Sequence, residues 1–322
     1  MLLPDMAMRI RPSASFLLVL AACGSSAMES PGASGPPVPP RQVPPDSGDG
    51  GSLPDMAPDA EAGSPGVPRL PKSTGVCPPI QSGDVTFAPA GVPPRKVKLA
   101  LEQPGKQGPL LLYWHATGSS PAEAAYSLGA TQATWTSAGG IVAAPYADPT
   151  AGQFGWFIVN QSPKLDDFLV ADEIVACLVE ARRIDPARIH SLGMSAGALQ
   201  TTALSYLRSS YLASVSTFSG GAVQDLSSLT EDPGNKFAAL VFHGGATDAL
   251  FGVDFQAASE SYRSNLSAAG HFAAICDHGK GHTIPRDAAP SVATFFAVHP
   301  FGASPSPYAS GLPASFPAYC KR

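Results

Sequence analysis

The chain has 322 residues, of which 44% are hydrophobic, so it is long and apolar enough to bury a sizeable core. Its formal net charge is −5 at pH 7, and its 20 Lys and Arg residues form no dense basic block. This charge pattern lacks the basic surface of nucleic-acid-binding proteins, so we expect no nucleic-acid partner.

The N-terminus has the pattern of an export signal. An apolar run over 16–22 follows two arginines and is too short to span a bilayer, but it is typical of a secretory signal. The run ends in Leu-Ala-Ala-Cys at 20–23, which resembles the lipobox of bacterial lipoproteins. We expect residues 1–23 to be a lipoprotein-type signal peptide with lipidation at Cys23. An ordinary signal peptide, with secretion, is the alternative.

A segment rich in Pro, Gly, Ser, Ala and Asp follows the signal. Residues 24–75 contain almost no aromatic or branched apolar side chains that could offset the entropy lost on ordering. This composition predicts a disordered tether over 24–75 and a folded domain over 76–322. We expect residues up to about Lys72 to be dispensable for activity.

Four cysteines remain after Cys23, an even number that suits two disulfides in an exported protein. Three pairings are possible. We favour Cys77 with Cys177 and Cys276 with Cys320, because Cys177 and Cys276 should lie at opposite ends of the predicted sheet.

Short apolar runs alternate with helical patterns from residue 84 onward, which predicts an α/β fold. The fold should contain a mostly parallel eight-stranded sheet with helices on both faces. The expected strands are 84–88, 96–102, 109–115, 140–146, 188–194, 213–219, 237–244 and 271–276.

Helix signals lie between these runs. Ser120, Pro121 and Glu123 form a capping pattern that predicts a helix from Pro121. Apolar residues recur at steps of three and four over 166–182, which predicts an amphipathic helix that ends before the Asp185-Pro186 break.

Ser195 lies in a G-x-S-x-G pattern between a predicted strand and a predicted helix. In that context the pattern predicts a tight turn that presents a nucleophilic serine at the carboxyl edge of the sheet. Gly193, Ala196 and Gly197 leave room for the strand and the helix to approach each other.

A nucleophilic serine needs a histidine to take its proton and an acid to orient the histidine. Asp248 follows a predicted strand and a glycine-rich loop, and Asp225 is the alternative acid. His282 follows Gly279 and Gly281 in a loop after the last strand, so we expect it to be the base and His278 to brace that loop, with His278 as the alternative base.

The oxyanion that forms during acyl transfer needs backbone donors. We expect these donors to be the N–H groups of Ala196, after the nucleophile, and of Thr117, after the strand at 109–115. Trp156 is a candidate wall of the substrate site, with a plain core position as the alternative.

Five motifs in one order resemble the secreted esterases of the poly(3-hydroxybutyrate) depolymerase and feruloyl esterase group, within the α/β-hydrolases. They are YWHATGSS, FGWF, IDPARIHSLGMSAG, FHGGATD and GHTIP, and the resemblance covers roughly 108–300. It implies the α/β-hydrolase fold and a catalytic triad of Ser195, Asp248 and His282. Ala116 departs from the family, which usually has a glycine at this position.

The expected function is that of a surface-tethered or secreted serine carboxylesterase that hydrolyses phenolic or acetyl esters of polysaccharide through an acyl-enzyme. A polyester depolymerase of the polyhydroxyalkanoate type is one alternative, and a catalytically silent surface-binding protein is another. His278 and His282 have an i, i+4 spacing, but their glycine-rich segment should not be helical, so we expect no metal site. We also expect no cofactor, a monomer, and membrane contact only through the lipid anchor.

Overall fold

The computed structural model describes residues 66–102, 106–223 and 229–322. The predicted lipidation site Cys23, most of the predicted tether and the alternative acid Asp225 lie outside these residues. Within them, no helix is both long and apolar enough to cross a membrane.

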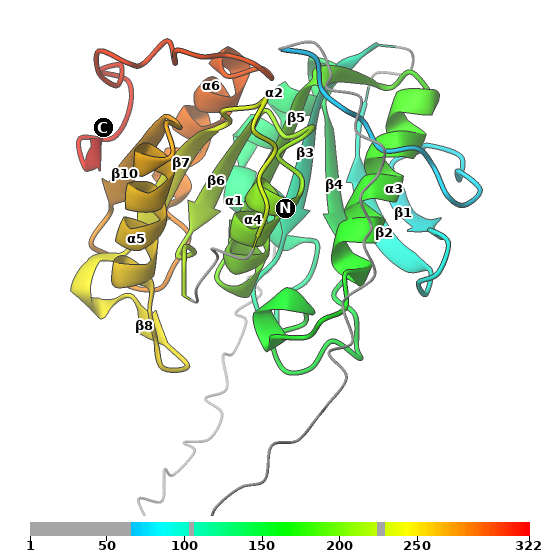
Figure 1. The fold of residues 1–322 in the computed structure, drawn as a ribbon, viewed down its shortest axis with the longest axis horizontal. Coiled ribbons are helices and arrows are strands. Elements are labelled where there is room, and N and C mark those ends of the chain that lie inside the picture. The colour runs from blue at the N-terminus through cyan, green and yellow to red at the C-terminus, as the bar shows by residue number, and fades with distance from the viewer. Residues whose placement is uncertain (1–65, 103–105, 224–228) are drawn as a thin grey trace, which may run out of the picture. The chain divides into compact units, whose positions relative to one another are not determined.

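A nine-stranded mixed sheet forms the centre of the domain (Figure 1), with the strand order β1-β2-β4-β3-β5-β6-β7-β10-β11. Within this sheet, neighbouring strands in the series β4-β3-β5-β6-β7-β10 are parallel. The strands β1 and β2 at one edge and β11 at the other pair antiparallel. The strands are β1 (Gly83–Phe87), β2 (Arg95–Ala100), β3 (Gly108–Trp114), β4 (Ile141–Pro145), β5 (Ile184–Met194), β6 (Ser214–Phe218), β7 (Ala238–His243), β10 (Ala273–Asp277) and β11 (Cys320–Lys321). The eight predicted strands are therefore confirmed, and the two-residue β11 is an addition.

Helices cover both faces of the sheet, as predicted. Figure 1 shows α3 (Asp166–Glu180), α4 (Ala196–Leu207) and α5 (Phe255–Ala268) in front of it. On the other face lie α1 (Glu123–Leu128), α2 (Ala130–Ser137) and α6 (Ala289–Val298). Successive β3 residues such as Leu110 and Leu111 enter opposite cores, which explains the unbroken apolar runs of the central strands.

Smaller elements lie in the loops. Three short 3-10 helices are η1 (Ile158–Asn160), η2 (Gly245–Thr247) and η3 (Arg286–Ala288). A separate two-stranded sheet consists of β8 (Ala249–Leu250) and β9 (Val253–Asp254), which makes 249–254 a hairpin.

Two predicted boundaries near helices are wrong. Strand β5 begins at Ile184, so Asp185 and Pro186 lie inside it, next to an irregular register with β3. Helix α1 begins at Glu123 rather than Pro121, and no side-chain cap forms at its N-terminus. The Glu123 carboxylate turns away from the helix to the loop after β3.

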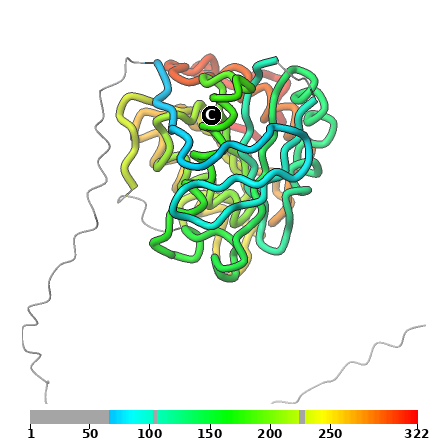
Figure 2. The backbone as a smooth tube through the Cα atoms, turned by 90° about the vertical axis from the view of Figure 1, so that its right-hand side faces the viewer, coloured from blue at the N-terminus to red at the C-terminus, as the bar shows by residue number. Residues whose placement is uncertain are grey.

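The boundary between tether and domain is also earlier than predicted, because residues 66–75 pack on the domain (blue in Figures 1 and 2). Arg69 forms an ion pair with Asp232 at 2.6 Å. The backbone N–H groups of Thr74 and Gly75 donate to the buried carboxylate of Glu173 at 2.8 and 2.9 Å. Composition does not predict this attachment, because the segment has few apolar side chains and is also held by backbone hydrogen bonds and an ion pair.

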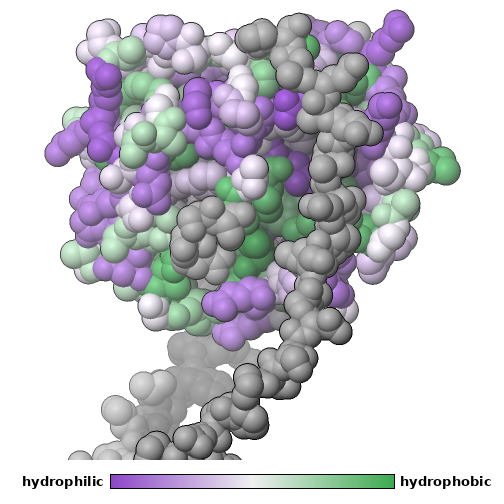
Figure 3. Space-filling model, viewed as in Figure 1, coloured by the Kyte–Doolittle hydropathy of each residue, from purple (hydrophilic) through white to green (hydrophobic). Residues whose placement is uncertain are grey.

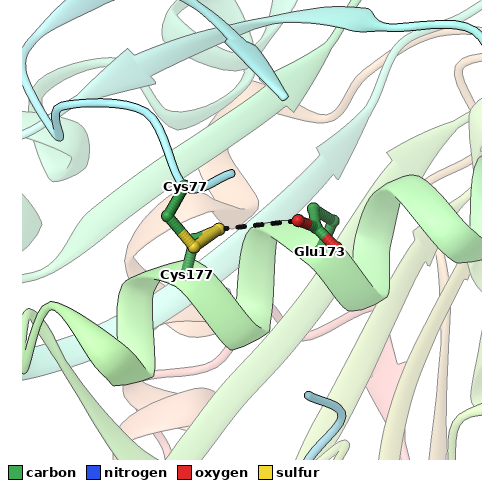
Figure 4. A group of neighbouring side chains, drawn as sticks. All are labelled: Cys77, Glu173 and Cys177. Carbon is green, nitrogen blue, oxygen red and sulfur yellow. Dashed lines mark hydrogen bonds between the residues drawn. A yellow bond between two sulfur atoms is a disulfide. The ribbon is translucent and has the colours of Figure 1, made fainter. Parts of the chain in front are cut away.

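Both favoured disulfides are confirmed. Cys77 pairs with Cys177 on α3 and ties the N-terminal segment to the domain beside Glu173 (Figure 4). Cys276 on β10 pairs with Cys320 on β11. The two bonds lie toward opposite edges of the sheet, which is the arrangement on which the predicted pairing rested.

Candidate active site

Ser195 lies at the sharp turn between β5 and α4. Its backbone has φ 56° and ψ −121°, in the left-handed range that non-glycine residues rarely adopt. A Cβ atom at Gly193 would lie 2.2 Å from the carbonyl oxygen of Gly197, and one at Gly197 would lie 2.0 Å from that of Trp114. Both glycines are therefore required by the close approach of the strand to the helix.

The structure brings Ser195, His282 and Asp248 together in one hydrogen-bonded chain. His282 Nδ1 is 2.7 Å from Asp248 Oδ1, and His282 Nε2 is 2.8 Å from Ser195 Oγ. Because an ionised carboxylate only accepts, Nδ1–H donates to Asp248, which leaves Nε2 to accept the serine proton. The Phe255 ring packs against the imidazole, with 4.5 Å between ring centroids.

The second carboxylate oxygen of Asp248 is fully engaged. It accepts hydrogen bonds from Ser219 Oγ at 2.8 Å and from the backbone N–H of Gly244 at 2.7 Å. Burial alone would raise the pKa of Asp248, but the hydrogen bonds from His282, Gly244 and Ser219 together lower it from the ordinary value of 3.8. The side chain is therefore held as the anion that a protonated imidazole requires.

Ser219 is a site residue that the sequence analysis missed. It lies just after β6 with a φ of 50°, and this conformation turns its hydroxyl toward Asp248. Its position at the end of a predicted central strand placed it at the correct edge of the sheet. No motif distinguished it from other serines.

His278, the alternative histidine, is not part of the hydrogen-bonded chain. Its Nδ1 accepts from the backbone N–H of Lys280 at 3.3 Å. The backbone N–H of His278 donates to the carbonyl of His243 at 3.0 Å. Both contacts join His278 to the loops that follow β7 and β10, which is compatible with a bracing role. Burial lowers the pKa of His278.

The loop after β3, residues 115–118, lies beside Ser195, and we name it the oxyanion loop after the role that the sequence predicts for Thr117. Thr117, Ala196 and Ser195 line the same cavity. The carbonyl of His115 accepts a hydrogen bond from Trp156 Nε1 at 3.0 Å, and the N–H of Ala116 donates to Glu123 Oε1 at 3.0 Å.

The prediction that Trp156 walls the substrate site is wrong. The side chain is 0% exposed and lies in the core, edge-on to Trp114 at 5.1 Å between ring centroids. Its indole supports the oxyanion loop from behind, and its neighbours Phe154 and Ile158 line the cavity in its place. The sequence placed Trp156 in the correct loop, but only packing could decide which face of that loop it takes.

An apolar cavity of about 230 Å³ opens beside Ser195. The segment 154–161 forms one wall of the cavity, the hairpin 249–254 forms another, and Leu199 on α4 also lines it. Phe154 and Phe251 meet edge to face across it, with 5.6 Å between ring centroids. No charged side chain lines the cavity among the residues that the structure describes.

No family model matches the sequence, and no curated protein matches it. Among solved structures, native sOPH has a TM-score of 0.59 at 16% identity and is covered over 96% of its length by 77% of this chain. Native pOPH has a TM-score of 0.61 at 16% identity, over 95% of its length and 76% of this chain. A thermostable esterase has a TM-score of 0.53 at 16% identity, over 62% of its length and 67% of this chain.

This domain has the α/β-hydrolase fold. The fold predicted from the motifs is thus confirmed, and Ser195 occupies the position that α/β-hydrolases give to their nucleophile, at the turn from a central strand to a helix.

A buried ion cluster fixes one wall of the cavity. Arg95 on β2 donates to Asp148 at 2.8 Å and to Asp167 at 2.9 Å, and all three side chains are buried. Asp167 also accepts from the backbone N–H of Phe157 at 2.8 Å. The cluster therefore pins both ends of the loop that carries the segment 154–161.

Proposed function

We propose that this protein is a serine carboxylester hydrolase that works through an acyl-enzyme. The observation that carries the proposal is the chain from Ser195 through His282 to Asp248 beside an uncharged apolar cavity. In this proposal Ser195 attacks the ester carbonyl while His282 takes its proton and later returns it to the leaving alcohol. Asp248 holds the imidazole in the required tautomer and stabilises its positive charge.

The backbone N–H groups of Ala196 and Thr117 are the proposed oxyanion donors. Both residues line the cavity with Ser195, and Ala196 is the first residue of α4, so the positive end of the helix dipole favours the developing negative charge. No step requires a cofactor or metal. In this proposal both ring nitrogens of His282 are used for proton transfer and orientation.

Phenolic esters of polysaccharide are the substrates that we propose first, with acetyl esters as the smaller members of the class. The support is the resemblance to the depolymerase and feruloyl esterase group and the aromatic side chains of Phe154, Phe251 and Phe255 around the cavity. A flat, uncharged acyl group suits such a lining.

A polyester depolymerase is the second candidate, and the rim of the cavity favours it. Val223, Leu250 and Phe251 are 43%, 42% and 57% exposed, and all three line the cavity. Hydrophobic side chains also gather in the middle and lower part of the face that Figure 3 shows. Exposed apolar side chains around a cavity are typical of binding to an apolar surface.

The test has two arms on the domain from residue 66 onward. In the first, a fluorophosphonate should label the wild-type protein and leave Ser195→Ala unlabelled; absence of labelling would favour the catalytically silent binding protein. In the second, rates on p-nitrophenyl acetate, butyrate and octanoate, methyl ferulate and polyhydroxyalkanoate granules are compared. A preference for methyl ferulate supports the phenolic ester, and release of soluble acid from granules supports the polyester.

Export with lipidation at Cys23 belongs to the same proposal, on the strength of the Leu-Ala-Ala-Cys motif. Radiolabelled palmitate should be incorporated into the full chain and not into Cys23→Ser. Processing at any other residue would contradict lipidation at this site and would favour the ordinary signal peptide.

A further inference from the structure

The oxyanion loop is held by a carboxylate that takes no part in the hydrogen-bonded chain of Ser195. Glu123 Oε1 accepts from the backbone N–H of Ala116 at 3.0 Å and from the hydroxyl of Tyr113 at 3.0 Å. We infer that Glu123 is a positioning residue that aims the Thr117 N–H at the oxyanion. The inference rests on the proposed function.

The hydrogen bond from Ala116 to Glu123 determines which backbone N–H of the loop can donate to the substrate oxygen. Since the Ala116 N–H is used by Glu123, the next backbone donor along the chain is Thr117, and Thr117 lines the cavity with Ser195. Two bonds fix the peptide between His115 and Ala116, one at the His115 carbonyl from Trp156 and one at the Ala116 N–H. With this peptide fixed, the direction of the following N–H is strongly restricted.

Tyr113 makes the carboxylate a rigid support. It lies near the end of β3 and is wholly buried, so it fixes the same oxygen atom that holds Ala116. Burial first, and the Glu123 charge second, raise the pKa of Tyr113 well above 10. The phenol therefore remains a hydrogen-bond donor throughout the pH range in which a serine hydrolase works.

Glu123 is not explained by a role in helix α1. The helix has six residues, its N-terminus has no side-chain cap, and the carboxylate points to the loop after β3. A negative charge close to an oxyanion is unfavourable by itself, and the two hydrogen bonds from Ala116 and Tyr113 reduce that cost. Glutamine would keep an acceptor oxygen at this position without the charge.

The experiment compares kcat and KM on p-nitrophenyl butyrate for Glu123→Ala, Glu123→Gln and Tyr113→Phe, with Glu260→Ala on the exposed side of α5 as the control. Glu123→Ala should lower kcat by about 10- to 100-fold and change KM less than about threefold, because loss of a whole oxyanion donor costs about 100- to 1000-fold. Glu123→Gln should stay within about fivefold of wild type, and Tyr113→Phe should lie between the two. Thermal melts identify any variant whose loss reflects unfolding.

A second readout separates this inference from the proposed function. The rate at which a fluorophosphonate labels Ser195 also depends on the oxyanion donors, and it requires no knowledge of the natural ester. Glu123→Ala should slow labelling about as much as it slows kcat. If folded Glu123→Ala labels and turns over within twofold of wild type, or if Glu123→Gln is as impaired as Glu123→Ala, Glu123 is not a positioning residue. If wild type is not labelled at all, the proposed function fails first.

Discussion

Ser195 reacts, in our proposal, from a backbone conformation that its neighbours have to enforce. Its N–H donates to the carbonyl of Phe218 at 2.9 Å, and the absence of side chains at Gly193 and Gly197 lets the neighbouring backbone approach this turn. Gly197→Ala should therefore abolish activity by separating α4 from β3, even though the added methyl group would not touch the ester.

The three residues of the chain should behave as a unit. Ser195→Ala and His282→Ala should each lower kcat by on the order of 10⁴- to 10⁶-fold, and the double variant should be little worse than either. Asp248→Asn should cost somewhat less, because the base remains but loses its oriented tautomer. Steady-state kinetics on the best p-nitrophenyl ester measure all four.

His278→Ala is the matched control for His282→Ala. It should lower kcat less than tenfold, because the hydrogen bond of the His278 imidazole within the described part of the chain is to the backbone N–H of Lys280 in the same loop. An inactive His278→Ala together with an active His282→Ala would show that the base is misassigned. Asp225→Asn is the corresponding control for Asp248→Asn, because Asp225 is the alternative acid. A loss of activity in Asp225→Asn but not in Asp248→Asn would show that the acid is misassigned.

The residues that the sequence could identify are those with a fixed place in a motif. Ser195, Asp248 and His282 follow predicted strands at one edge of the sheet, so their meeting could be expected. Glu123 and Ser219 could not be found in this way, because their contacts depend on side-chain direction. Glu123 even carried a misleading signal, since its position suits a helix cap.

At the scale of elements, the loop between β4 and α3 depends on the buried cluster around Arg95. Burial raises the pKa of Asp167, whereas Asp148, although burial opposes it, has its pKa lowered by the hydrogen bonds from Thr150 and by Arg95. Arg95→Met should lower the free energy of unfolding by about 3–5 kcal/mol, because two buried carboxylates lose their partner. Denaturant melts measure this loss.

Lys98→Met is the control for Arg95→Met, because Lys98 is an exposed cation on the same strand. It should change the free energy of unfolding by less than about 0.5 kcal/mol. Arg95→Met should also raise KM, since the anchored loop forms a wall of the cavity. Equal stability of the two variants would show that the cluster does not hold the loop.

Period and composition predicted the central strands because both faces of the sheet are buried there, so these strands are continuous apolar runs. The edge strands β1 and β2 could be predicted because their buried and exposed residues alternate. The same signals could not predict β11. Two residues carry no periodicity, and the pairing of Ile275 with Lys321 follows from the disulfide next to it. The start of the domain was misplaced for a related reason, since contacts to Glu173 leave no trace in composition.

For the whole molecule, two truncations test where the domain begins. Removal of residues 1–65 should leave the melting temperature and kcat unchanged, because residues 1–23 are the predicted signal peptide and the predicted tether has almost no aromatic or branched apolar side chains to bury. Removal of residues 1–76 should lower the free energy of unfolding by on the order of 3 kcal/mol, because the buried Glu173 carboxylate loses its donors Thr74 and Gly75.

Glu173→Gln provides the matched rescue. In the shorter chain this change removes the unpaired charge and should recover part of the lost stability, whereas in the longer chain it should destabilise. If both truncations melt alike, residues 66–76 contribute nothing to the fold.

The short β11 has a consequence for how the protein behaves among other copies of itself. Strand β10 is the last parallel strand, and without a neighbour its free N–H and C=O groups would offer a template to any extended chain. Two residues of β11, fastened by Cys276 and Cys320, occupy part of that template. If Cys276–Cys320 is reduced, we expect β11 to separate from β10 while Ser195, His282 and Asp248 stay in place. Aggregation should therefore appear before activity is lost.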